Sequence, residues 1–426
     1  MSSEEKFDAI VIGAGTAGCA CAYALAREGK SVLLVERGAT AGSKNVTGGR
    51  LYTYALELLE PGLYKRAPLQ RKVVSEQIMM LGKNSAVTLD YTDFEFGQGV
   101  PQSYTVLRGV LDEWFAGEAE AQGAMVACGI RVDELLEENG RIVGIRAGDD
   151  DMYADVVIAA DGVNSLIAQK AGLRGDISAH SVGVGVKEII ELPDAVIEQR
   201  FGLEGDQGAA RVVLGCTEGI SGGAFLYTNK GSVSLGIVFN PEQAASHGKR
   251  IHEILQDFKT HPAILPLIEG GETTEYGAHL VPELGLDGVP ERLHREGLLL
   301  VGDAAGFCIN AGIILRGMDL AILSGLAAAN AVIRSERPAD VGPRYRQELD
   351  ALIIPTMKVF AGYHHVMGLP RLFTTYPELA NDAMKFAFAV DGKVPQKTTT
   401  GLLGTVRRHV SFGQLISDGW KGVRSI

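Results

Sequence analysis

The sequence predicts an α/β fold that opens with a strand–helix–strand unit. The apolar run 7–12 has the composition of a strand, and three closely spaced glycines follow it. Residues 19–28 are alanine-rich and of helical composition, Gly29 ends this helix, and 31–35 is a second apolar strand. Because a helix connects the two strands, we expect them to lie parallel in one sheet.

The glycines predict a dinucleotide site. Gly13, Gly15 and Gly18 have the G-x-G-x-x-G spacing, and Glu36 follows the second strand, 23 positions after Gly13. The three glycines permit, in order, a tight turn, close approach of a pyrophosphate, and close helix–strand packing. The helix N-terminus offers N–H groups to the phosphates, and Glu36 is expected to accept hydrogen bonds from the adenosine ribose. A glycine-rich turn without a ligand is the alternative, and this motif alone does not distinguish NAD from FAD.

Composition and charge exclude several classes of function. The chain has 426 residues, enough for two or three domains. It carries 40 Lys or Arg against 52 Asp or Glu, and no dense basic run precedes Arg407 and Arg408, so nucleic acid is not an expected partner. The five cysteines indicate reduced thiols in a cytosolic protein. The acidic start predicts no signal peptide, and no uncharged stretch reaches the ~20 residues of a spanning helix.

Further sheet-edge signatures follow in order. The strand 156–160 ends in Asp161-Gly162, and the strand 298–301 ends in Gly302-Asp303. Between the first helix and these strands, Arg108 opens a predicted helix over 109–122. One Asp–Gly pair is usually only a turn. The ordered set is far more specific, since strand ends at one sheet edge suit a long dinucleotide.

With these motifs, the chain resembles the FAD-binding fold shared by aromatic hydroxylases, geranylgeranyl reductases and electron-transfer-flavoprotein:quinone oxidoreductases. The resemblance implies a Rossmann-like FAD-binding domain of the glutathione-reductase type 2, an antiparallel-sheet substrate domain and a C-terminal helical region. The implied boundaries are 1–76, 105–175 and 277–345 for a discontinuous FAD-binding domain, 77–104 and 176–276 for the substrate or quinone domain, and 346–426 for the helical region, a candidate for membrane or subunit docking.

The same resemblance implies the cofactor contacts. Asp303 would hold the ribityl–pyrophosphate region, the segment 129–132 would be a strand that meets the adenine, and a helix beginning at Gly312 would point its N-terminus at the isoalloxazine. The implied FAD contacts are Gly13, Gly15, Thr16, Ala17, Gly18, Glu36, Arg37, Asn45, Thr47, Gly48, Gly49, Arg50, Arg108, Val132, Asp161, Gly162, Gly302, Asp303, Gly312, Ile313 and Ile314. The implied substrate contacts are Gly223, Phe225 and Tyr227, with ordinary sheet core as the alternative.

Several segments narrow the resemblance to FixC-type quinone oxidoreductases, namely 44–52, 184–193, 222–228 and 315–321. The Trp-x-Phe-Pro box of geranylgeranyl reductases is replaced by Phe225-Leu-Tyr-Thr. The resemblance implies electron transfer from an electron-transfer flavoprotein heterodimer through FAD to a membrane quinone, in a multi-subunit complex for which electron bifurcation is left open. A geranylgeranyl reductase, a flavin monooxygenase and a non-turnover docking subunit are the alternatives.

Cysteine and glycine usage bears on the redox partners. No Cys follows Cys308, so this chain alone is not expected to hold a [4Fe–4S] cluster, and the resemblance implies a small ferredoxin-like iron–sulfur subunit. Gly183-Val-Gly185 lacks a third glycine and precedes a strand, so no nicotinamide site is expected.

The adjacent His364 and His365 have no third ligand at helical spacing, so no metal site is expected. No catalytic residue is assigned.

Two further expectations concern surfaces. Alternation over 232–238 predicts a half-exposed antiparallel strand. The segment 352–377 is apolar and aromatic with little charge, which favours docking at a lipid interface over a helical core or a subunit interface. We therefore expect a cytoplasmic protein that lies peripherally on the inner face of the cell membrane.

Overall fold

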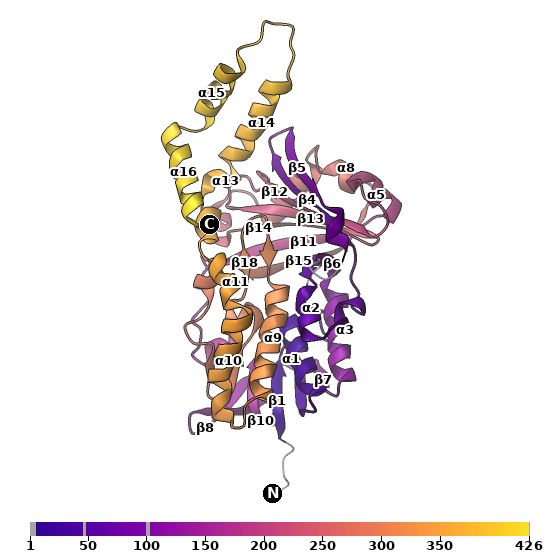
Figure 1. The fold of residues 1–426 in the computed structure, drawn as a ribbon, viewed down its shortest axis with the longest axis vertical. Helices are drawn as coiled ribbons and strands as arrows, with labels where there is room; N and C mark the ends of the chain where they lie inside the picture. Colours follow the sequence, from indigo (N-terminus) through magenta and orange to yellow (C-terminus); the bar gives the residue numbers. More distant parts are fainter. Residues whose placement is uncertain (1–5, 46–47, 99–102, 426) are drawn as a thin grey trace.

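The computed structural model describes residues 6–45, 48–98 and 103–425, and these form two sheets with a helical C-terminal region (Figure 1). In the first sheet, five strands run parallel in the order β7, β2, β1, β10, β17, and β16 adds antiparallel to β17. The bounds are β1 Phe7–Ile12, β2 Val32–Glu36, β7 Met125–Cys128, β10 Asp150–Ala159, β16 His294–Arg295 and β17 Leu298–Leu300. A β8–β9 ribbon, Glu134–Glu138 and Arg141–Ala147, pairs with β10.

Helices pack closely on the first sheet. These are α1 (Thr16–Arg27), α3 (Arg108–Ala121), α9 (Met318–Ile333) and α10 (Pro338–Leu352). A Cβ atom on Gly325 of α9 would lie 2.2 Å from the carbonyl oxygen of Ala17, so the glycine allows α9 to approach α1 directly. The predicted parallel sheet and its first helix are confirmed.

The second sheet contains nine strands in the order β15, β11, β14, β13, β12, β4, β6, β3, with β5 added on β4. Every pairing is antiparallel except that of β4 with β12. The bounds are β3 Gly48–Tyr52, β4 Lys72–Leu81, β5 Ala86–Thr92, β6 Ser103–Leu107, β11 Val182–Glu191, β12 Gln207–Leu214, β13 Gly222–Asn229, β14 Ser232–Phe239 and β15 Glu272–Pro282. Thus β3, which lies in the predicted segment 1–76, pairs within the second sheet.

One face of the second sheet is covered by helices α5 (Asp194–Phe201), α7 (Ile251–Thr260) and α8 (Leu265–Ile268), whose buried side chains share a core with β11, β13 and β14. The expectation of a half-exposed strand at 232–238 is wrong, because β14 is buried along most of its length. As an inner strand it pairs on both edges, and its Ser234 hydroxyl accepts a hydrogen bond from Asn229 Nδ2 (2.8 Å).

The predicted C-terminal helical region is confirmed. It comprises α11 Ile354–Val359, α12 Tyr363–Met367, α13 Pro370–Phe373, α14 Thr375–Phe388, α15 Thr398–His409 and α16 Phe412–Ser425. Helices α14 and α15 form a hairpin that projects beyond the second sheet (Figure 1). Asp418 of α16 joins this region, since it accepts hydrogen bonds from Arg371 (2.6 and 2.7 Å) and Tyr376 (2.7 Å). No helix in the described part of the chain is long and apolar enough to cross a bilayer.

Candidate functional site

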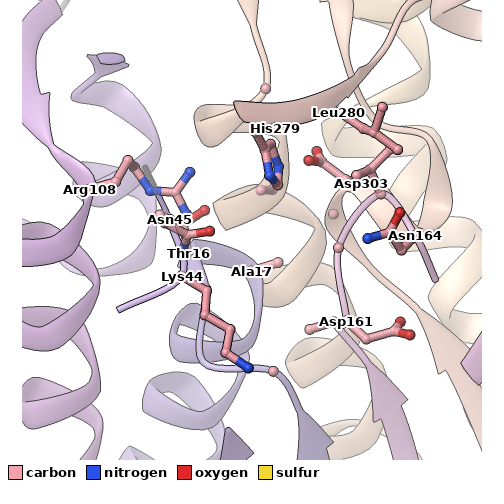
Figure 2. Close-up of a pocket in the computed structure, with 18 of the residues that line it drawn as sticks. Thr16, Ala17, Lys44, Asn45, Arg108, Asp161, Asn164, His279, Leu280 and Asp303 are labelled. Atoms are coloured by element: carbon pink, nitrogen blue, oxygen red, sulfur yellow. The ribbon is translucent and has the colours of Figure 1, made fainter. Parts of the chain in front are cut away.

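A cavity of about 920 Å³ lies between the carboxyl ends of the parallel strands and one face of the second sheet (Figure 2). The predicted residues that line it are Gly13, Gly15, Thr16, Ala17, Glu36, Arg37, Asn45, Gly48, Gly49, Arg50, Arg108, Val132, Asp161, Gly162, Phe225, Tyr227, Gly302 and Asp303. Gly18, Gly223 and the segment 312–314 are not among its lining residues, and Thr47 falls outside the described part of the chain.

The glycine-rich turn forms one end of the cavity. Gly13 has a φ of +103°, and a Cβ atom there would lie 2.4 Å from the carbonyl oxygen of Ala160. A Cβ atom on Gly18 would lie 1.9 Å from the carbonyl oxygen of Gly13. No side chain caps the N-terminus of α1 at Gly15, so its first N–H groups are available to an anion. This end therefore fits a pyrophosphate.

Glu36 is fixed by the same turn. Its carboxylate accepts hydrogen bonds from the backbone N–H groups of Ala14 (3.0 Å) and Gly38 (2.6 Å). A carboxylate has about four acceptor sites, so two donors leave capacity for hydroxyl groups of a ligand. Glu36 also lines the cavity, which is the arrangement that recognition of a ribose requires.

Arg108 is oriented by a carboxylate that the sequence analysis missed. Asp112, one helical turn later in α3, is fully buried and accepts hydrogen bonds from Arg108 Nε (3.0 Å) and Nη2 (2.8 Å). Asn45 Nδ2 donates to the same carboxylate. Arg108 Nη2 lies 3.8 Å from the position of a Cβ atom on Gly15, so the guanidinium reaches the pyrophosphate end. The i, i+4 spacing of Arg and Asp is the signal that could have found Asp112.

Two aspartates lie on the opposite side of the cavity from Arg108 and Asn45 in Figure 2. Asp161 Oδ2 accepts a hydrogen bond from the backbone N–H of Ile167 (3.0 Å), so this carboxylate also holds the start of α4 (Leu166–Lys170). The Asp303 carboxylate has no hydrogen-bond partner among the described residues, and burial raises its pKa while Arg108 opposes that rise. A partly buried carboxylate without a hydrogen-bond partner fits a ligand rich in hydroxyl groups, such as a ribityl chain.

Arg50 is held in place on β3. Its Nη1 donates to Glu76 Oε2 (2.9 Å) and its Nε to Ser103 Oγ (2.8 Å). The adjacent Gly49 also lines the cavity, and a Cβ atom there would lie 2.9 Å from Met318 Cε. The absence of a side chain at Gly49 therefore allows the Met318 side chain to approach β3 at this part of the cavity.

The helix expected to begin at Gly312 begins instead at Met318, so that expectation is corrected. Residues Ile309–Asn310 and Leu315–Arg316 pair as a short antiparallel hairpin, β18 and β19, which uses the intervening residues as its turn. Gly317 and Met318 reach the cavity at the true start of the helix. A cofactor contact by Gly312, Ile313 or Ile314 stays a prediction. The position of these residues outside the lining of the cavity does not favour it.

The segment 129–132 is likewise not a strand, since β7 ends at Cys128. The backbone turns at Gly129, where φ is +78°, and the N–H of Gly129 donates to the carbonyl oxygen of Gly38 (2.7 Å). Val132 still lines the cavity from this connection.

Side chains of the second sheet line the end of the cavity away from the glycine-rich turn. Phe225 and Tyr227 stack with ring centroids 4.9 Å apart, and burial raises the pKa of Tyr227 to about 12. His279 of β15 faces the same space, and burial lowers its pKa to about 4, so its imidazole is neutral at pH 7. Lys187 of β11 completes this group. Lys187 and His279 are not predicted from the sequence, since no local motif marks either residue.

Comparisons with known proteins agree with this geometry. The chain matches the family descriptions "FAD dependent oxidoreductase" at residues 8–91, "ETF-QO, ubiquinone-binding" at 182–281 and "ETF-QO/FixC family C-terminal domain" at 363–426. It is 45% identical to Protein FixC of Salmonella typhi over 426 residues, covering 99% of each chain. It is also 45% identical to the probable electron transfer flavoprotein-quinone oxidoreductase YdiS of Escherichia coli, covering 100% of each.

Solved structures show the same fold at low identity. A geranylgeranyl bacteriochlorophyll reductase-like protein from Thermoplasma acidophilum aligns with a TM-score of 0.72 at 20% identity, over 98% of this chain and 99% of that one. PqsL of P. aeruginosa aligns with a TM-score of 0.65 at 16% identity, over 88% and 98%. These structures share the fold of the chain, and the full-length identities to curated relatives are more specific. The chain belongs to the FixC-type electron-transfer-flavoprotein:quinone oxidoreductases, and it is a FAD-dependent oxidoreductase.

Proposed function

We propose that the chain passes electrons from an electron-transfer flavoprotein heterodimer through FAD to a membrane quinone. The observation that carries the proposal is the two-ended cavity. One end is built for a dinucleotide, and the other is lined by Phe225, Tyr227 and further side chains of residues 182–281, the range that matches the ubiquinone-binding family. A flavin ring between these ends would lie next to an aromatic site for a second ring.

The residues have distinct roles in this proposal. The N-terminus of α1 and Arg108 hold the pyrophosphate, Glu36 the adenosine ribose, and Asp303 the ribityl hydroxyls. Bound FAD supplies one- and two-electron transfer, which couples a one-electron carrier to a two-electron acceptor. Gly49, Met318 and the second sheet enclose the ring and exclude water from it.

We further propose that a separate ferredoxin-like iron–sulfur subunit joins the complex. No Cys follows Cys308 in the sequence, and the described residues contain no cluster of three or more metal-ligating side chains. We extend the proposal to electron bifurcation within such a complex. Co-purification from membranes, with identification of partners and cofactors, tests the presence of this subunit.

Anaerobic stopped-flow spectroscopy of the FAD-loaded protein tests the electron path. Reduced electron-transfer flavoprotein is expected to reduce the flavin rapidly, and a soluble quinone analogue to reoxidise it. Rapid reduction by NADH or NADPH without a protein partner would favour a monooxygenase or a polyprenyl reductase. Flavin that is reduced but not reoxidised by quinone would indicate a docking subunit without turnover.

Membrane contact is proposed for α14–α16 rather than for the predicted segment 352–377. Within that segment Leu369 and Phe373 are buried. By contrast, Phe388 is 80% exposed, and Val390 and Val394 are each 95% exposed. On α16, the exposed apolar side chains recur at helical spacing, namely Phe412, Leu415, Ile416, Trp420 and Val423.

Charge favours an anionic lipid surface for this part of the chain. Residues 383–426 hold seven Lys or Arg against two Asp, whereas the whole chain has a net charge of −12. A basic residue near an anionic bilayer contributes about 1 kcal/mol of attraction, and an exposed apolar helix face adds insertion at the interface.

Replacing Ile416 and Trp420 together by Ser is expected to weaken binding to phosphatidylglycerol vesicles at least about tenfold, because this removes the centre of the α16 apolar face. Vesicle co-sedimentation measures the change. Met125 on β7 is 58% exposed, and Met125→Ser serves as the control that leaves binding unchanged. Equal sedimentation of wild type and double variant would contradict the assignment of α16, and equal binding to phosphatidylcholine would contradict the role of charge.

A further inference from the structure

Lys187 extends from β11 into the cavity over a patch without side chains. Its direct neighbours on the two flanking strands are Gly236 of β14 and Gly277 of β15. Directly opposed residues of antiparallel strands place their side chains on the same face. Gly185, two residues earlier, occupies that face as well. The lysine side chain therefore extends over Gly185, where a Cβ atom would lie 3.5 Å from Lys187 Cε, and no side chain of a directly opposed residue flanks it.

Aromatic rings border this patch. A Cβ atom on Gly236 would lie 2.7 Å from Phe225 Cζ, so the Phe225 ring fills the space above that glycine. Lys187 Nζ lies 5.6 Å from the centroid of the same ring. The ammonium group is thus placed beside the aromatic side chains that line the cavity.

Lys187 differs from two arginines that line the cavity, Arg50 and Arg108, in having no carboxylate partner among the described residues. Arg50 is paired with Glu76, and Arg108 with Asp112. Lys187 makes no hydrogen bond or ion pair within the described ranges, and burial, together with the nearby Arg108, lowers its pKa to about 8. A buried ammonium without an acceptor is costly, so a ligand of negative charge at this place would be stabilised.

The titratable groups that face Lys187 do not neutralise it. Asp303 opposes the fall in its pKa from across the cavity, but at no hydrogen-bonding distance. His279 of β15 is neutral at pH 7, and the raised pKa of Tyr227 of β13 keeps its phenol neutral too. The charge of Arg108 is balanced by Asp112, so Lys187 remains a cation without a hydrogen-bonded counter-charge among the described residues.

We propose that the Lys187 ammonium faces the isoalloxazine ring of bound FAD and stabilises the negative charge that the ring gains on reduction. The inference requires FAD in the cavity, and it deepens the proposed function by naming the residue that sets the flavin potential. Because the site is shielded from water, a fixed cation there stabilises a developing negative charge more strongly than it would in solvent.

A spectroscopic redox titration of FAD-loaded protein with a chemical reductant tests this without any protein partner or quinone. In Lys187→Met, the equilibrium constant for flavin reduction is expected to fall at least about tenfold, which is about 30 mV for a two-electron couple. Lys187→Arg keeps the charge and is expected to retain most of the wild-type potential. Lys83→Met removes an exposed lysine outside the cavity, and is expected to leave the potential unchanged.

The pH dependence gives a second readout if Lys187→Met does not hold FAD. Reduction raises the pKa of Lys187, so the wild-type potential should fall more steeply with pH above about 8. Arginine stays charged, so Lys187→Arg should lack this extra slope. A wild-type potential in Lys187→Met, or equal slopes in wild type and Lys187→Arg from pH 7 to 10, would overturn the inference. If Lys187→Met lowers the flavin potential as expected, but reduced electron-transfer flavoprotein does not reduce the flavin of the wild-type chain, the proposed function alone is refuted.

Discussion

Replacement of Gly13 by Ala is expected to give a chain that no longer retains FAD. The residue has a φ of +103°, a conformation that costs an L side chain about 1–3 kcal/mol. In addition, the new Cβ atom would lie 2.4 Å from the carbonyl oxygen of Ala160, which belongs to backbone and has little room to move. The turn must therefore shift, and the N-terminus of α1 shifts with it. FAD content per folded chain, read from the visible absorbance, measures the loss.

Gly117→Ala is the matched control for this change. Gly117 lies inside α3, is exposed, and has no atom within 4 Å of the position of a Cβ atom. Alanine in a helix interior is about 1 kcal/mol more favourable than glycine, so this variant should retain FAD and unfold at a slightly higher temperature. If Gly13→Ala held FAD as tightly as Gly117→Ala, the turn would not be the pyrophosphate site.

Replacement of Asp112 by Asn is expected to lower the free energy of unfolding by about 3–5 kcal/mol, because it removes one partner of a buried ion pair and leaves the Arg108 guanidinium without its counter-charge. Asp112 is fully buried and bonds two nitrogen atoms of Arg108 at 2.8 and 3.0 Å. The loss of orientation at Arg108 should also weaken FAD binding. Urea unfolding and a FAD titration measure the two effects.

The chain offers a close control for Asp112. Arg346 and Asp350 form an ion pair with the same i, i+4 order on α10, but both side chains are about half exposed. Such exposed pairs contribute roughly 0.5 kcal/mol or less, so Asp350→Asn should hardly change stability and should bind FAD normally. Equal effects of the two substitutions would show that burial of the Arg108 pair does not matter.

Much of the fold could be predicted because its signals are local. The glycine spacing, the acidic residue after β2 and the apolar strands lie within short segments, and the family resemblance and the FAD cofactor that they implied are confirmed. The dinucleotide end of the cavity likewise brings together residues that the motifs named. Asp112, which orients Arg108 at this end, was not predicted. It lies only one helical turn from Arg108, but a single carboxylate on a helix is usually exposed to solvent.

The rest depends on pairings that the sequence does not display. The start of α9 moved to Met318 because β18 and β19 pair across a turn, and that pairing has only two residues in each strand. The environment of Lys187 arises from glycines on two strands distant in sequence, so no local pattern marks it. The lipid-contacting surface expected at 352–377 stays a prediction; tertiary packing buries Leu369 and Phe373 within it, whereas α16 leaves Trp420 exposed.

The most direct check of the account is the flavin content of the purified, folded wild-type chain. We expect one FAD per chain, released intact into the supernatant when the protein is denatured by acid, because no covalent attachment is part of the site described above. A monodisperse, cooperatively unfolding protein that is colourless and takes up no added FAD would contradict the central claim.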